Sequence, residues 1–469
     1  MPPDDDHLDW ERGWERAGRR DEARFDPEVV ASTGARLDEF AQGLTGPERV
    51  ALVALLDAAQ VDTPLRQLAE TPASQMLTVN EMATFRKLRD APPPAGVLRP
   101  SLHVVMKATR LCNLRCTYCN YWRDGPGQVM TFPVLARTLY GVLSDPNVRQ
   151  AEFIWHGGEP TLLGTEFFRK ALWLQQRFRR PGQVVRNRTQ TNATQLSDEF
   201  VQFWRQFRFI VGVSLDGPPE IHDRRRVDRL GRPTAATVRR GLDRLVAAGH
   251  DPRVLLVVDD AAIDAGAERI LSYLLELGLR RVGLLNVVPE NTPRGATGPG
   301  AYLAWPRYVG FLRDLFDLWW PDHVSAINLR EIADLARQLL GGPPQLCNFA
   351  GDCFGSIFTV EPDGEVAACD RYVTVEAKHF GSVAVTPFPE LATGPRMHEL
   401  VTANHAATRA TARCRWFEVC HGGCPHDRDL SASLIPGWDN GCCGLAPLLD
   451  HMAERIPTSH QPTEETCPK

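Results

Sequence analysis

The spacing of apolar and polar residues divides the chain near residue 99. Before that point, Phe25–Gln60 and Thr63–Arg89 carry apolar residues at helical spacing. The proline-rich stretch Ala91–Gly96 follows and predicts a linker. We therefore expect residues 1–98 to form a mainly helical extension, in which no motif carries recognisable chemistry.

From residue 99 onward, short β-rich runs alternate with helical stretches. Strands are predicted over Leu102–Lys107, Ala151–His156, Val184–Gln190, Phe209–Leu215, Arg253–Val258 and Arg281–Val287. Helices are predicted over Thr131–Leu143, Glu166–Phe178, Ser197–Gln206, Ala235–Ala248 and Ala262–Leu277. These six β/α repeats predict an α/β fold with a parallel sheet curved into a partial, TIM-like barrel, whose chemistry gathers at the carboxyl ends of the strands.

The last part of the chain has a different character. Two further helices are predicted over Tyr302–Trp320 and Asn328–Leu340. From Pro343 on, cysteine, glycine and proline become more frequent and the periodicity weakens, as expected for a small domain that a metal holds together. The sequence thus predicts an extension over 1–98, a barrel over 99–300, bridging helices over 301–342 and a metal-binding domain over 343–469.

Composition narrows the range of partners. The chain has 469 residues, 43% of them hydrophobic, and a formal net charge of −5. This balance shows no basic excess that would point to nucleic acid. No apolar run reaches the ~18–20 residues that a membrane-spanning helix needs, and Met1–Asp9 has no signal-peptide core. We expect a cytoplasmic protein with neither a nucleic-acid nor a membrane partner.

Twelve cysteines are too few and too unevenly placed for a disulfide scaffold. Cys112, Cys116 and Cys119 follow the first predicted strand with C-x3-C-x2-C spacing. Three thiolates on one loop can hold three irons of a [4Fe–4S] cluster and leave the fourth iron open. The alternatives are a structural zinc site, which would want a fourth ligand nearby, and three unrelated buried thiols.

The cysteine spacing, with Tyr118 before the last thiol, resembles the loop of the radical S-adenosylmethionine (SAM) superfamily. The resemblance extends to strings at later strand ends, which are Trp155-His-Gly-Gly-Glu-Pro160, Thr189-Gln-Thr-Asn192 and Val213-Ser-Leu-Asp-Gly217. It implies a SAM-binding [4Fe–4S] cluster on the three cysteines. It also implies that SAM is bound by Tyr118, Gly157, Gly158, Glu159, Asn192, Ser214, Arg226 and Val288. Glycines suit a close backbone approach to SAM, and a carboxylate suits its ammonium group.

The other nine cysteines lie between Cys347 and Cys467. The strings Val360–Asp370, Cys414–Cys420 and His421–Arg428 resemble the SPASM extension, which binds two auxiliary [4Fe–4S] clusters. The likeness is closest to anaerobic sulfatase-maturating enzymes and related peptide maturases. It implies one auxiliary cluster on Cys347, Cys353, Cys369 and Cys424.

The second auxiliary cluster departs from this pattern. The resemblance implies that it binds Cys414, Cys420 and one of Cys442 or Cys443, with a further cysteine where this chain has Thr411. The threonine leaves open whether that cluster has an open iron, a substitute ligand or fewer irons. We expect Cys467 to be a free thiol in the tail.

The resemblance also implies a function. SAM would be cleaved to a 5′-deoxyadenosyl radical, and a peptide or protein side chain would be oxidised to formylglycine or to a crosslink. Flavodoxin or ferredoxin would be the reductant, and the N-terminal extension would grip a leader peptide or occlude the site. Asp370 matches the proposed catalytic base, with a turn carboxylate or a partner of Arg371 as the alternative. The competing functions are a radical SAM dehydrogenase of a small molecule and a non-enzymatic iron–sulfur electron carrier or redox sensor.

Overall fold

The computed structural model describes residues 40, 43–45, 48, 62–119, 121–122, 127–289 and 302–456. The chain forms two compact units, residues 1–67 and 68–469, and the boundary lies within helix α4 (Asp62–Glu70). Most of the predicted helical stretch Phe25–Gln60 lies outside the described residues, as does Cys467. Where the predicted domain boundaries fall stays a prediction.

The helical periodicity of Thr63–Arg89 is confirmed, but it belongs to three helices. Helix α4 is followed by α5 (Ala73–Met76) and α6 (Val79–Arg89). Thr78 and Glu81 form a capping box, in which each side chain accepts a hydrogen bond from the other's backbone N–H. This reciprocal cap explains why a new helix begins at Val79.

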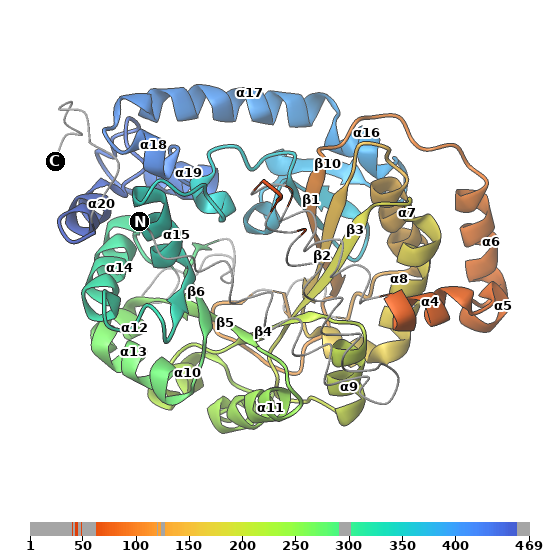
Figure 1. The fold of residues 1–469 in the computed structure, drawn as a ribbon, viewed down its shortest axis with the longest axis horizontal. Helices are drawn as coiled ribbons and strands as arrows, with labels where there is room; N and C mark the ends of the chain where they lie inside the picture. Colours follow the sequence, from red (N-terminus) through yellow and green to blue (C-terminus); the bar gives the residue numbers. More distant parts are fainter. Residues whose placement is uncertain are drawn as a thin grey trace. The chain divides into compact units, whose positions relative to one another are not determined.

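The six predicted strands are confirmed as consecutive neighbours in one parallel sheet. They are β1 (Ser101–Thr109), β2 (Gln150–Gly157), β3 (Val184–Thr191), β4 (Ile210–Ser214), β5 (Arg253–Val258) and β6 (Arg281–Asn286). The fold is therefore the predicted α/β partial barrel, and Figure 1 shows the curved sheet with helices along its outer side. Because the strands run in parallel, their carboxyl ends lie together on one side of the barrel.

The helices between the strands follow the predicted order. They are α7 (Phe132–Leu143), α8 (Gly164–Phe178), α9 (Asp198–Gln206), α11 (Ala235–Ala247), α12 (Asp260–Ala265) and α13 (Ala267–Glu276), with η2 (Pro160–Leu163) and α10 (Pro219–Arg225) in the loops. The prediction of one helix over Ala262–Leu277 is wrong. Gly266 has a φ of +85° and separates α12 from α13, because a residue in that conformation cannot continue a right-handed helix.

The core between sheet and helices is rich in aromatic residues. Phe168 on α8 packs edge to face against Trp155 of β2 and against Phe209. Phe203 on α9 contacts both Phe168 and Phe209. Such pairs add about 0.5–1.5 kcal/mol each beyond the area that they bury, so this packing fixes the strands that carry the site.

The sheet extends beyond the six predicted strands at both edges. β8 (Ile357–Val360) pairs in parallel with β1, and β9 (Glu365–Ala367) and β10 (His379–Ser382) follow in antiparallel order. At the other edge, β7 (Asn328–Leu329) pairs with β6, so the predicted helix Asn328–Leu340 begins two residues later than expected. The order is β10-β9-β8-β1-β2-β3-β4-β5-β6-β7. The C-terminal segment thus completes the sheet beside β1.

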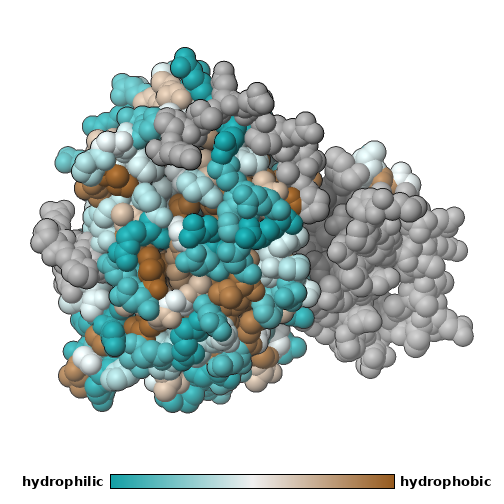
Figure 2. Space-filling view, turned by 90° about the vertical axis from the view of Figure 1, so that its left-hand side faces the viewer, coloured by the Kyte–Doolittle hydropathy of each residue, from teal (hydrophilic) through white to brown (hydrophobic). Residues whose placement is uncertain are grey.

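The remaining elements of the C-terminal part are mostly short. They are α14 (Trp305–Trp319), α15 (Arg330–Leu339), η4 (Cys347–Phe349), η5 (Asp370–Tyr372), η6 (Glu376–Lys378), α16 (Phe388–Ala392), α17 (Pro395–Ala410), η7 (Thr411–Arg413), α18 (Phe417–Cys420), α19 (Pro425–Leu434) and α20 (Ala446–Ala453). Figure 2 shows one face of the molecule, on which hydrophilic side chains predominate and hydrophobic ones form small separate groups. Among the described helices, none is long and apolar enough to cross a membrane.

Candidate active site

The loop that follows β1 carries Cys112, Cys116 and Cys119, none of which forms a disulfide. Burial raises the pKa of Cys112 and of Cys116 to about 12, and the nearby Cys119 thiol adds to both shifts. Thiols in such a place stay protonated unless a cation binds, because a coordinated thiol loses its proton outright. This donor set therefore fits the cluster that the spacing predicts.

The glycines of the next loop pack directly on the cysteine loop. Gly158 N donates to Thr109 O over 2.6 Å, and Glu159 N donates to Leu111 O over 2.7 Å. A Cβ at Gly157 would lie 2.3 Å from Thr109 O, and one at Gly158 would lie 2.0 Å from Leu111 O. Only glycine permits this approach, so the two loops hold each other's backbone in place.

The Glu159 carboxylate is fully buried and accepts four hydrogen bonds. They come from the backbone N–H and the hydroxyl of Thr161, the hydroxyl of Thr191, and the backbone N–H of Asn192, over 2.7–3.1 Å. Burial raises the pKa of Glu159, and the hydrogen bonds oppose that rise. In this structure the carboxylate thus ties the end of β2 to the end of β3.

Asn192 and Ser214 continue the site along the strand ends. The Asn192 amide nitrogen donates to Asn113 Oδ1 over 2.8 Å and lies 4.0 Å from Cys112 Sγ. Ser214, at the end of β4, accepts a hydrogen bond of 2.9 Å from the Gln190 amide. Val288 is buried two residues beyond the end of β6. These predicted positions therefore lie along the edge where the strands end.

Asp216 joins two of the predicted residues, and the sequence analysis assigned it no role. Its buried carboxylate pairs with Arg226 Nε over 2.9 Å and accepts a 2.7 Å hydrogen bond from the Tyr118 hydroxyl. Arg226 also lies over the Tyr118 ring and reaches Cys116 Sγ at 3.9 Å. Burial would raise the pKa of Asp216, but Arg226 and Arg225 hold it below its usual value. The signal available in the sequence was an acidic residue directly after a predicted strand.

A second group missed from the sequence is centred on Lys107, a fully buried lysine on β1. Its Nζ lies 2.5 Å from Asp370 Oδ1 and 2.9 Å from His156 Nδ1. Burial and Lys107 together lower the pKa of His156 to about 4, so this imidazole is neutral near pH 7. Burial opposes ionisation of Asp370, but Lys107 and His156 hold its pKa below its usual value.

The alternative roles that the sequence left for Asp370 can now be compared with its contacts. Arg371, its chain neighbour, pairs with Asp427 and donates to Asn286 Oδ1 over 3.2 Å. Asp370 pairs with Lys107 on β1 instead. The carboxylate therefore faces the barrel, although its catalytic role stays a prediction.

The C-terminal thiols that the structure describes, between Cys347 and Cys443, fall into two groups of four. In the first, burial raises the pKa of Cys353 to about 12, and the Cys347 thiol adds to this. Burial also raises the pKa of Cys369 and of Cys424, and Cys353 and Cys347 add to both. These four residues, Cys347, Cys353, Cys369 and Cys424, are the set that the resemblance implies for one auxiliary cluster. We call them the first four-thiol group.

The second four-thiol group consists of Cys414, Cys420, Cys442 and Cys443. The Cys414 thiol is hydrogen-bonded to that of Cys442, and the Cys443 thiol to those of Cys420 and Cys442. These bonds raise the pKa of Cys414 and of Cys443, whereas the bond from Cys443 lowers the pKa of Cys420. Both members of the vicinal pair are thus in the group, where the sequence resemblance calls for one.

Within the described residues, no group of three or more His, Cys, Asp or Glu side chains is arranged to hold a single metal ion. A [4Fe–4S] cluster binds each thiolate at a different iron, so its ligands surround a cube rather than one ion. The fit to clusters rests on the type and the grouping of the donors.

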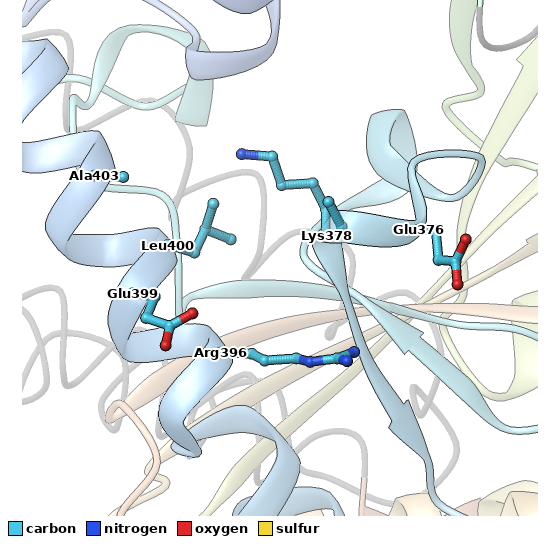
Figure 3. Close-up of a pocket in the computed structure, with 7 residues that line it drawn as sticks. Glu376, Lys378, Arg396, Glu399, Leu400 and Ala403 are labelled. Carbon is cyan, nitrogen blue, oxygen red and sulfur yellow. The ribbon is translucent and has the colours of Figure 1, made fainter.

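A cavity of about 590 Å³ lies elsewhere, between α17 and the turn at η6 (Figure 3). In Figure 3, Arg396 and Glu399 project from α17, opposite Lys378 and Glu376. Its lining consists of Glu376, Ala377, Lys378, Arg396, Glu399, Leu400 and Ala403. We place the chemistry at the thiol sites, because these side chains offer no redox group.

Comparison with known proteins agrees with this geometry. A model of the radical SAM superfamily matches residues 106–261, and a model of the SPASM iron–sulfur cluster-binding domain matches residues 353–425. A cysteine-type anaerobic sulfatase-maturating enzyme of Clostridium perfringens is 30% identical over 341 residues, which cover 70% of this chain and 90% of that enzyme. This chain belongs to the anaerobic sulfatase-maturating family of radical SAM enzymes.

Other relatives in this family differ in type. A serine-type anaerobic sulfatase-maturating enzyme of Bacteroides thetaiotaomicron is 27% identical over 396 residues, covering 78% of this chain and 95% of that enzyme. The structure of native anSMEcpe with bound AdoMet and the Cp18Cys peptide matches with a TM-score of 0.67 and 28% identity, over 76% of this chain and 98% of that one. Streptococcus suis SuiB bound to S-adenosylmethionine, at 14% identity and a TM-score of 0.52 over 75% of this chain and 77% of that one, shares the fold.

Family membership confirms several predictions. The protein is a radical SAM enzyme with a SPASM domain, and these two domains bind SAM and iron–sulfur clusters. The roles of individual residues, the number of clusters and the identity of the reductant stay predictions.

Proposed function

We propose that this radical SAM enzyme oxidises a side chain of a peptide or protein substrate, to formylglycine or to a crosslink. The observation that most directly supports this function is the position of Asp370. It follows Cys369 of the first four-thiol group and pairs with Lys107, which lies on the strand that leads to Cys112. A proton acceptor thus lies between the site of SAM and a potential electron acceptor.

Three iron–sulfur clusters, each a [4Fe–4S] cluster, follow from the three thiol groups. The cluster on Cys112, Cys116 and Cys119 has one iron free for SAM, whereas each four-thiol group supplies four ligands. When bound, SAM and its cluster would supply a 5′-deoxyadenosyl radical for removal of a hydrogen atom from substrate carbon, and the auxiliary clusters would be the acceptor for the electron that the resulting substrate radical loses.

The chain's own residues bind and orient SAM. We assign this role to Tyr118, Gly157, Gly158, Glu159, Asn192, Ser214, Arg226 and Val288. Glu159 acts through the loops that it ties together, because its oxygens already accept four hydrogen bonds. Arg226 is held by Asp216 beside Cys116, where a cation suits the SAM carboxylate.

Asp370 is the proposed base for the proton that the substrate side chain releases. Against the effect of burial, Lys107 and His156 lower its pKa, so the carboxylate is ionised near pH 7 and can accept a proton, which it then holds weakly and passes on readily. Lys107 is a positioning residue, because it contacts Asp370 and His156. Because His156 is neutral, the ion pair of Lys107 is formed with the Asp370 carboxylate and not with a charge on the imidazole.

A deuterium-transfer experiment tests this function. The anaerobically reconstituted enzyme is given SAM, dithionite and sulfatase-derived peptides deuterated at Cβ of the target cysteine or serine, with an alanine peptide as control. We expect deuterium in 5′-deoxyadenosine and an aldehyde in the peptide, found by mass spectrometry. SAM cleavage without deuterium transfer from either peptide would rule out formylglycine formation.

A peptide crosslink is tested in the same way, with any short peptide that a neighbouring reading frame is found to encode as the substrate. The expected product has lost the mass of two hydrogens per bond and resists reduction. A small-molecule dehydrogenase remains the competing function. It is favoured if both peptide classes fail while a small alcohol or amine transfers deuterium. Running the assay with reduced flavodoxin or ferredoxin in place of dithionite tests the identity of the reductant.

A further inference from the structure

The second four-thiol group lies in a segment whose sequence departs from the expected pattern. Thr411 stands where a cysteine is expected, three residues before Cys414. Its side chain is fully buried, and its hydroxyl donates to Thr408 O over 2.7 Å. Thr411 is therefore engaged within its own turn.

The neighbouring glycines place Thr411 and Cys443 against one tight turn. A Cβ at Gly422 would lie 2.6 Å from the Thr411 hydroxyl, and one at Gly423 would lie 2.8 Å from Cβ of Cys443. Both glycines have positive φ, at +80° and +69°. Within the Cys420–Cys424 turn, Gly422 thus packs against Thr411, and Gly423 packs against Cys443.

The segment with the vicinal pair is fixed in place. The Trp305 indole donates to Cys443 O over 2.9 Å, and Gly444 N donates to Cys442 Sγ over 3.3 Å. At Gly444, whose φ is +81°, a Cβ would lie 2.6 Å from the Trp438 ring and 2.7 Å from that of Trp305. Two tryptophans therefore pack against the turn that follows the two cysteines, of which Cys443 is buried and Cys442 partly buried.

Contacts among the four thiols form an unbroken chain. The Cys414 thiol is hydrogen-bonded to that of Cys442. The Cys443 thiol is hydrogen-bonded to those of Cys442 and Cys420. Cys414, Cys420 and Cys443 are each less than 7% exposed, so three of the thiols are shielded from water. Four clustered sulfurs are the complement that a [4Fe–4S] cluster needs to ligate every iron.

We propose that Cys443 replaces the missing thiol at Thr411, so that Cys414, Cys420, Cys442 and Cys443 together close the second auxiliary cluster. This inference rests on the proposed function only in assuming that the group binds a cluster. A closed cluster has no iron for substrate, so it serves electron transfer and does not bind the peptide.

Variants of the vicinal pair test the ligand set through the iron itself. We compare Cys443→Ser, Cys442→Ser, the double variant Cys443→Ser/Thr411→Cys, and Cys467→Ser as a control. Iron, acid-labile sulfide and Mössbauer spectra are measured after anaerobic reconstitution. We expect each single variant to lose or alter one cluster, Thr411→Cys to restore it in the Cys443→Ser background, and Cys467→Ser to match the wild type.

Two results would overturn the inference. One is Cys443→Ser or Cys442→Ser with wild-type iron content and spectrum. The other is zinc without sulfide at this group. Formation of 5′-deoxyadenosine is measured in parallel in the wild type and in the control Cys467→Ser, and both should cleave SAM. Loss of that reaction in the wild type would refute the proposed function and leave the ligand question intact.

A measurement on the unmodified enzyme tests the same inference without requiring that any variant folds. Excess SAM first occupies the open iron of the three-cysteine loop, and a small exogenous ligand such as cyanide is then added. A closed second cluster gives no further change in the Mössbauer or EPR spectrum. A new shifted signal would reveal another open iron and contradict the inference.

Discussion

The three-cysteine loop and the two four-thiol groups are built on different scaffolds. The loop is clamped by backbone hydrogen bonds from its neighbours, with Gly158 donating to Thr109 O and Thr117 donating to Arg225 O. The four-thiol groups collect residues from segments between Cys347 and Cys443, in which most elements are short turns and helices. The sheet thus shapes the first site, while the four-thiol groups depend more on the thiols and on what they bind.

The difference in thiol number corresponds to a difference in chemistry. Three thiolates leave an iron for SAM, whereas four leave none. Lys107 and Asp370 connect the two kinds of site, because the lysine belongs to β1 and the carboxylate follows Cys369. If this division is right, variants should separate SAM cleavage from substrate oxidation.

The largest expected effect is at the three-cysteine loop. Cys116→Ser should reduce 5′-deoxyadenosine formation by at least about 1,000-fold, because SAM cleavage depends on the cluster that this thiol binds. Chromatography of anaerobic reactions measures it, and iron analysis should show that the other clusters are retained. Wild-type rates of SAM cleavage would remove the distinction between the sites.

The matching change in a four-thiol group should have the opposite selectivity. Cys424→Ala should lower peptide product by about 100-fold, if the electron leaves through this cluster, and leave 5′-deoxyadenosine within about twofold. The ratio of the two products, followed over time, is the measurement. Equal loss of both would show that the first four-thiol group supports SAM cleavage as well.

Gly158→Ala tests the backbone clamp on the cysteine loop. The added Cβ would meet Leu111 O at 2.0 Å, so the loop must shift. If this overpacking of about 1–3 kcal/mol falls on the transition state of SAM cleavage, the rate should fall by about 5- to 150-fold. Gly310→Ala is the matched control, because nothing lies within 4 Å of its Cβ in helix α14. It should leave activity unchanged, and a loss in this control would discredit the steric explanation.

The smallest expected effect concerns Lys107, which links the two kinds of site. Lys107→Met keeps the length of the side chain but leaves Asp370 without its cation, and should lower peptide product by about 10-fold. The fraction of SAM cleavage events that yield product should fall, while Lys107→Arg should recover part of it. Circular dichroism confirms folding, and an unchanged product fraction in Lys107→Met would refute the positioning role.

Much of the barrel could be predicted from sequence because its signals are local. Five of the six strands from β1 to β6 carry apolar runs bounded by turns, and β3 begins with a pair of valines. Each of the six was predicted within about two residues. Strands β7 to β10 were missed, because two to four residues carry too little periodicity to identify a strand. The break at Gly266 was missed because one glycine within a helical pattern does not reveal its φ angle.

The residues of the candidate site likewise fall into those that the sequence predicted and those that it missed. Thiol spacing was enough to single out the cysteine loop, because this motif is continuous in the chain, whereas the cofactor ligands came from the resemblance to a known family and stay predictions. Asp216 and Lys107 were missed because their importance comes from Arg226, Tyr118, His156 and Asp370, which distant segments supply.

By itself, the sequence determined the order of the β/α repeats and the positions of the thiol motifs and glycine-rich strand ends, because these are properties of short segments. The tertiary structure decided which thiols meet and which charges face them. It placed both Cys442 and Cys443 beside Cys414 and Cys420, and it brought Asp370 to β1 through the pairing of β8 with that strand. These choices depend on long-range packing, in which residues more than 200 positions apart in the chain become neighbours.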